Sequence, residues 1–108
     1  MNTELLTVFM TAPDVEVAER LGRILVEERL IACANVVQDV ISLYRWEGEV
    51  QRDSEALVIM KTTADALAAL EARAVELHPY DVPEVLALPV VGGHGSYMDW
   101  VRAEVGAP

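Results

Sequence analysis

The hydrophobic positions of this chain change their period several times, and each change marks the boundary of a predicted strand or helix. Residues 5–10 (LLTVFM) form an apolar run of strand length that ends at residues 11–13. Asp14 is a good helix N-cap, and after it apolar residues recur at helical spacing as far as about Leu30. The chain therefore begins with a central strand followed by a helix.

The middle of the chain predicts a long β-hairpin. Residues 33–46 are dominated by β-branched side chains, and the polar residues Gln38 and Asp39 interrupt them, which indicates a bend or bulge. Residues 47–49 form a polar loop in which Gly48 can adopt positive φ. A partner strand then runs from Val50 and becomes strongly apolar at residues 56–61 (ALVIMK).

The last third predicts a helix, a strand and a second helix. Thr62 or Thr63 can cap the first of these helices, which must end before Pro79. Residues 84–91 supply a final strand, and residues 96–105 supply a short terminal helix. The order is that of a split βαβ arrangement, an α+β fold in which helices cover one side of an antiparallel sheet. We expect one domain over residues 1–108.

Two structural expectations follow from the hairpin. Its arms are longer than the other strands, so we expect further copies of the chain to cover it in a closed homo-oligomer. Ile59 lies at the centre of ALVIMK, and its truncation to alanine is expected to cost about 2 to 5 kcal/mol, as for a buried aliphatic residue.

Charge and composition exclude several classes of protein. A hydrophobic fraction of 53% predicts a substantial core, whereas a net charge of −10 repels phosphate backbones and argues against nucleic-acid binding. No apolar run approaches a membrane span, and residues 1–4 lack the basic region of a secretory signal, so we expect a cytoplasmic protein. The lone cysteine, Cys33, is consistent with a reducing compartment.

The sequence offers little support for an enzyme. It contains no GxSxG, HExxH or phosphate-loop motif. Asp81 and Glu84 form a conceivable acid–base pair on the segment HPYDVPE, which two prolines make rigid, but Glu84 can equally begin the following strand. We therefore expect a binding or regulatory protein without catalytic residues.

Six segments, taken together in order and spacing, resemble the CutA family of divalent-cation tolerance proteins: VFMTAPD, RLIACANVV, SLYRWEGEV, ALVIMKTT, HPYDVPEVLALPV and YMDWV. They span nearly the whole chain. The resemblance implies a ferredoxin-like protomer, a tight homotrimer, a cytoplasmic location and a link to tolerance of copper and other divalent metals.

The resemblance also implies where a metal would bind. Some relatives use a cysteine at the end of the first strand, a histidine pair before Pro-Tyr and a cysteine after the first helix. The matching positions here are Met10, Leu77 with His78, and Cys33, so two of the four lack the relatives' ligand type. Met10, Cys33 and His78 still suit Cu(I). The alternative is that Met10 fills the core, Cys33 acts as a small hydrophobe and His78 ends a helix.

A second candidate site is a cleft at a subunit boundary, with aromatic walls and some charge. Lys61 and Arg45 would make it favour a small anionic ligand; the alternative is that its aromatic residues pack the hairpin against neighbouring subunits. The residues we assign to this cleft are Tyr44, Trp46, Lys61, Tyr80, Glu84 and Trp100.

Two functions follow from these sites. The first is a divalent metal tolerance protein, a metal-responsive homotrimer whose His78 contacts copper or another divalent cation. The second is a regulatory or scaffolding trimer similar to PII-type regulators, in which clefts between subunits bind a small ligand or a protein partner.

Overall fold

The computed structural model describes residues 4–106, so the ends of the expected domain, residues 1–3 and 107–108, lie outside the described residues. The elements, in chain order, are β1 (Leu5–Ala12), α1 (Val15–Glu27), β2 (Cys33–Trp46), β3 (Glu49–Thr63), a 3₁₀ turn (Ala64–Ala66), α2 (Leu67–Leu77), β4 (Val85–Pro89) and α3 (Gly95–Glu104). No helix in this part of the chain is long and apolar enough to cross a membrane.

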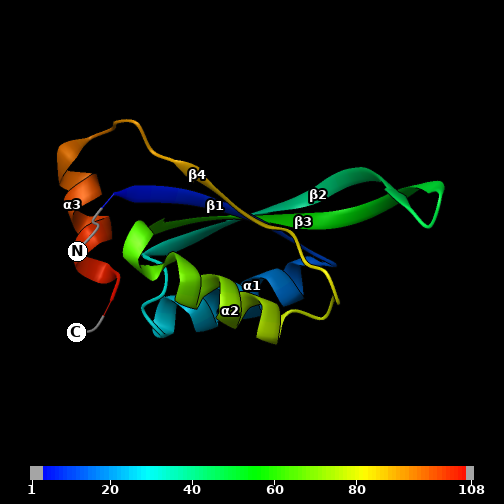
Figure 1. Cartoon of the computed structure of the whole chain (residues 1–108), viewed down its shortest axis with the longest axis horizontal. Helices are drawn as coiled ribbons and strands as arrows, with labels where there is room; N and C mark the ends of the chain where they lie inside the picture. Colours follow the sequence, from blue (N-terminus) through cyan, green and yellow to red (C-terminus); the bar gives the residue numbers. More distant parts are fainter. Residues whose placement is uncertain (1–3, 107–108) are drawn as a thin grey trace.

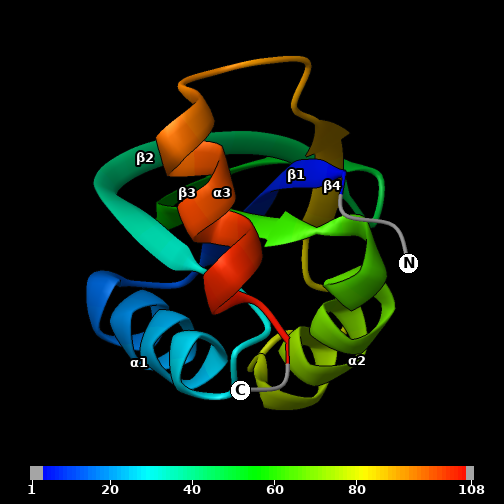
Figure 2. The same ribbon diagram turned by 90° about the vertical axis from the view of Figure 1, so that its left-hand side faces the viewer.

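The four strands form one antiparallel sheet in the order β2-β3-β1-β4. Helices α1 and α2 cover one face of it, as predicted (Figure 1). Helix α3 departs from the prediction, since it lies at the end of the sheet farthest from the tip of the hairpin (Figures 1 and 2). There its Val101 is buried against Leu5 and Ala32. The α+β split βαβ class is confirmed.

The core lies between the sheet and the first two helices. Alternate residues of a strand point to opposite faces, so Val8 and Met10 of β1 and Val58 and Met60 of β3 face the helices and are fully buried. Ile59 pairs with Phe9 on the other face of the sheet and is only half-buried in the single chain. The assignment of Ile59 to the core was therefore wrong, because the buried positions of ALVIMK are its neighbours.

Helix α1 begins as predicted but ends earlier. The Asp14 carboxylate accepts a hydrogen bond from the Val17 backbone N–H at 2.8 Å. The helix ends at Glu27 rather than about Leu30, because Arg29 adopts a left-handed φ of 61° and the Leu30 N–H turns back to the Leu25 carbonyl at 3.0 Å.

Replacing Asp14 with alanine removes this cap and should lower the free energy of unfolding by about 1 kcal/mol. Urea unfolding followed by circular dichroism measures the change. The Asp14→Asn variant keeps an accepting side-chain oxygen and should lose less than the alanine variant. Equal losses in the two variants would show that the cap bond does not stabilise the helix.

Several other boundaries differ from the prediction because of tertiary pairing. Strand β1 continues to Ala12, since its last residues pair with Leu57 and Ala56 of β3. Neither Thr62 nor Thr63 caps α2: both belong to β3, Thr63 makes no side-chain cap bond, and the Thr62 hydroxyl donates to the Leu30 carbonyl at 2.7 Å. Strand β4 is shorter than the expected range of 84–91, and α3 is shifted by one residue from 96–105.

The hairpin of β2 and β3 agrees closely with the prediction. The register of the two strands shifts between Val37 and Val40, and Asp39 inside this bulge has a φ of 61°. Glu47 and Gly48 both have positive φ, 51° and 82°, as a two-residue hairpin turn with the twist of the strands requires. The outer half of the hairpin projects beyond the sheet and makes the molecule 43 Å long (Figure 1).

Candidate functional site

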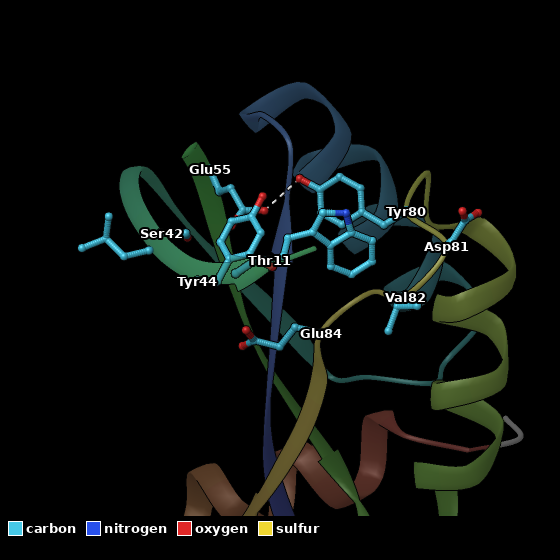
Figure 3. Close-up of a pocket in the computed structure, with 10 residues that line it drawn as sticks. Thr11, Ser42, Tyr44, Glu55, Tyr80, Asp81, Val82 and Glu84 are labelled. Atoms are coloured by element: carbon cyan, nitrogen blue, oxygen red, sulfur yellow. Dashed lines mark hydrogen bonds between the residues drawn. The ribbon is translucent and has the colours of Figure 1, made fainter. Parts of the chain in front are cut away.

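A cleft of about 560 Å³ opens where the hairpin leaves the sheet and the connection from α2 to β4 passes the end of β1 (Figure 3). Three segments distant in sequence form its walls: the end of β1, the outer hairpin and the rigid segment predicted at 78–84. The lining residues are Thr11, Ser42, Leu43, Tyr44, Trp46, Glu55, Tyr80, Asp81, Val82 and Glu84.

Two tyrosines of the cleft are fixed by carboxylates of β3. The Tyr80 hydroxyl donates to the Glu55 carboxylate at 2.8 Å, which links the 78–84 segment to the hairpin (Figure 3). The Tyr44 hydroxyl donates to the carboxylate of Asp53. Asp53 and Glu55 are two residues apart on a strand and so share a face. These hydrogen bonds orient both phenol rings and leave neither hydroxyl with a free donor.

Hydrogen bonds of the His78 ring hold Tyr80 in this position. It is 7% exposed, and its Nε2 lies 2.7 Å from the carbonyl oxygen of Thr11, which can only accept. Nε2 therefore carries the proton, and Nδ1 accepts a hydrogen bond from the Tyr80 N–H at 3.1 Å. The two rings are tilted, with centroids 4.7 Å apart. Both ring nitrogens of His78 are thus used to hold Tyr80 and the following residues against β1.

The surroundings of the tyrosines keep them neutral. Burial first, and then the hydrogen bond to Glu55, raise the pKa of Tyr80 well above its ordinary value of 10.0. The hydrogen bond to Asp53 raises the pKa of Tyr44. At the far end of the sheet, the hydrogen bond with the Cys33 thiol, followed by burial, raises the pKa of Tyr97 to about 12.

These shifts predict a pH dependence that all three tyrosines share. The folded protein holds the phenolic protons more tightly than the unfolded chain, so this contribution to stability is complete below pH 10 and is lost as the pH rises from 10 towards the folded pKa values. At pH 10 the near-ultraviolet phenolate absorbance of the folded protein should be well under half of that measured in denaturant at complete ionisation. Half-ionisation of the folded tyrosines at pH 10 would contradict the shifts.

The chain matches a known protein family over nearly its full length. Residues 6–104 match the family model described as "CutA1 divalent ion tolerance protein". The chain belongs to the CutA1 family. It is 48% identical to the divalent-cation tolerance protein CutA of Thermus thermophilus, over 92% of this chain and 96% of that protein. It is 43% identical to human protein CutA over 87% of this chain but only 52% of that one, so it spans about half the length of this relative.

Solved CutA1 structures share the architecture. The structure of CutA1 from Oryza sativa superposes with a TM-score of 0.95 at 39% identity, covering 99% of this chain and 98% of the other. That of the Thermus thermophilus protein gives 0.92 at 47% identity, covering 94% and 99%. The ferredoxin-like protomer implied by the CutA resemblance is therefore confirmed.

The three metal candidates implied by that resemblance do not meet within one CutA1 chain. Met10 is fully buried on the helix-covered face. Cys33 pairs with Lys61, which pairs with Thr7, so it lies on the opposite face, where its Sγ is 3.4 Å from the Tyr97 hydroxyl. His78 contacts Thr11, four residues or roughly 13 Å further along β1. Among residues 4–106 no group of three or more His, Cys, Asp or Glu side chains is arranged to hold a metal ion.

The predicted cleft is assembled in part. Tyr44, Trp46, Tyr80 and Glu84 line it together. Lys61 does not, because it lies opposite Cys33 and donates to the Asn35 side chain at 3.2 Å. Trp100 lies on α3 beside Tyr97, with ring centroids 5.7 Å apart. Within the single chain, the topology therefore places these two residues at the other end of the sheet, away from the other four.

The charges that line the cleft in the single chain differ from those expected. Arg45 donates to the Gly48 carbonyl at 3.2 Å and does not line the cleft, so neither predicted cation does. Neither Asp53 nor Glu55 was assigned to the cleft from the sequence. The alternation of Asp53 and Glu55 on one strand face was the signal that could have identified them. Within the single chain the cleft is acidic, which argues against the expected anionic ligand.

Proposed function

We propose that this chain acts in the tolerance of divalent cations, as a homotrimer and without catalysing a reaction. The observation that carries the proposal is the match of residues 6–104 to the divalent ion tolerance family. The description of that family names a tolerance function and no reaction. The relatives and structures reported above bear CutA names, so nothing there favours the PII-like alternative.

The face of the sheet opposite α1 and α2, which α3 covers only at one end, supports the homotrimer. Phe9, Leu57 and Ile59 lie on the face opposite α1 and α2, beside Leu86 and Leu88, which are 59% and 42% exposed in the single chain. A contiguous apolar sheet face of this kind is a subunit interface or an aggregation hazard. Light scattering at micromolar concentration should give the mass of three chains, and a monomer mass would contradict the proposal.

The donor chemistry argues for loosely held ions. The soft ligands Met10 and Cys33 lie on opposite faces of the sheet, and both nitrogens of His78 are bonded to backbone groups. This arrangement does not fit a tight Cu(I) site made by Met10, Cys33 and His78 of one chain. The 18 acidic residues instead provide carboxylate oxygens, which suit hard divalent ions. We therefore propose weak, exchangeable binding of divalent cations.

A bacterial strain without its own CutA1 protein provides the test of function. The chain should improve growth in raised copper or zinc relative to an empty vector, and Asp14→Asn, a fold control away from any metal candidate, should do the same. Equal growth with the chain and the empty vector would remove the proposal.

Native mass spectrometry separates the modes of metal binding. Titration with Cu(I), Cu(II) and Zn(II) should show loose uptake that a chelator reverses, unchanged in Cys33→Ser and His78→Gln. Tight uptake of one ion per chain, lost in both variants, would restore the soft-ligand site and contradict weak binding.

A further inference from the structure

The charges around the cleft select for cations. Of its ten lining residues, all within the described chain, Glu55, Asp81 and Glu84 are acidic and none is lysine or arginine. Asp53, which does not line the cleft itself, adds a fourth carboxylate that accepts a hydrogen bond from the Tyr44 hydroxyl. In Figure 3 Glu55 lies beside Tyr44 and Glu84 extends towards the same side, whereas Asp81 lies on the outer rim. The carboxylates of Glu55 and Glu84 therefore line the same cleft as the two tyrosines.

The remaining walls are aromatic and apolar. Tyr44 is 42% exposed and Trp46 54% exposed, and both line the cleft together with Tyr80. The tyrosine hydroxyls donate to Asp53 and Glu55, so a ligand meets ring faces rather than free hydroxyl donors. Phenols that donate to carboxylates gain electron density in the ring, which strengthens the attraction of the ring face for a cation.

We propose that this cleft binds a small organic cation, an alkylated ammonium whose alkyl groups contact the rings of Tyr44, Trp46 and Tyr80 while Glu55 and Glu84 balance its charge. Recognition of quaternary ammonium groups by cages of aromatic residues is an established use of the cation–π interaction. A volume of about 560 Å³ lies within the range of pockets for small organic ligands.

A bare or hydrated metal ion fits this cleft less well than an organic cation. Hard divalent ions require six or more oxygen ligands in a polar shell. Here the Glu55 carboxylate already accepts a hydrogen bond from the Tyr80 hydroxyl, and Leu43 and Val82 make part of the wall apolar. An alkylated ammonium needs no inner-sphere oxygen and benefits from the same apolar surface. This site is independent of the tolerance function proposed above.

Calorimetric titration with choline chloride, at constant ionic strength, tests the proposal. Its uncharged carbon isostere, 3,3-dimethylbutan-1-ol, is the matched ligand control. We expect saturable binding of choline at one molecule per chain. The isostere should bind more weakly by a factor of about ten or more. No binding of choline, or equal binding of choline and the isostere, would overturn the proposal.

Matched variants locate the binding. Trp46→Leu and Glu84→Gln should each weaken choline binding about tenfold, and Trp46→Phe, which keeps a ring, should recover part of the loss. Trp100→Leu removes the other tryptophan, at the far end of the sheet, and should leave binding unchanged. Weakening by Trp100→Leu equal to that by Trp46→Leu would place the ligand elsewhere. If the chain binds choline but does not improve growth in copper or zinc over the empty vector, only the tolerance proposal is refuted.

Discussion

Truncation of Met60 to alanine should lower the free energy of unfolding by about 2 to 5 kcal/mol, the largest loss we expect from a single change. Met60 lies at the centre of the sheet, is fully buried, and pairs with Val8 on one side and Ala34 on the other. Its removal leaves a cavity that rigid strands on both sides cannot close. Urea unfolding at a fixed chain concentration measures the loss, because an oligomer's stability depends on concentration.

The neighbouring residue provides a control on the other face of the same strand. Met60→Leu conserves volume and should cost less than about 1.5 kcal/mol. Ile59→Ala should act chiefly on assembly, since Ile59 lies on the face of the sheet opposite α1 and α2. A loss of only a few tenths of a kcal/mol for Met60→Ala would mean that the core is not where the structure places it.

Replacement of His78 by alanine should be the second largest loss, about 2 to 4 kcal/mol. The change removes two hydrogen bonds and leaves the Thr11 carbonyl and the Tyr80 N–H without this partner at a largely buried position. Since His78 positions Tyr80, choline binding should weaken in the same variant. Urea unfolding and calorimetry provide the two measurements.

The second histidine is the matched control for this prediction. His94 is exposed and makes no side-chain cap bond to α3, so His94→Ala should change stability by less than about 0.5 kcal/mol. An unchanged stability of His78→Ala, together with a loss of metal binding, would show that His78 is a ligand and not a structural residue.

Much of the fold follows from the sequence because its determinants are local. The bounds of β2 were predicted at both ends, as was its bulge at Gln38 and Asp39, because a strand-length run interrupted by polar residues leaves few alternatives. Asp14 begins α1 through a bond that spans three residues. The turn at Gly48 depends on the φ of two adjacent residues.

Predictions failed where a distant segment sets the outcome. Thr62 looks like a helix cap, but its hydroxyl donates to the carbonyl of Leu30, in the connection between α1 and β2. Ile59 looks like a core residue, and only the register against β1 shows that Met60 occupies the core. The end of α1 shifted because Arg29 takes a left-handed conformation that the residue type does not favour.

The sequence by itself determined the elements, their order, the CutA resemblance and the acidic character of the protein. The tertiary structure alone decided the site. It brings Tyr80 into contact with Glu55, 25 positions away in the sequence. It places Lys61 and Trp100 at the far end of the sheet. Because side chains alternate along a strand, it also places Met10 and Cys33 on opposite faces of the sheet. Local propensities act over a few residues, whereas a cleft depends on strand register and on where a connection crosses the sheet, and these emerge only when the whole chain packs.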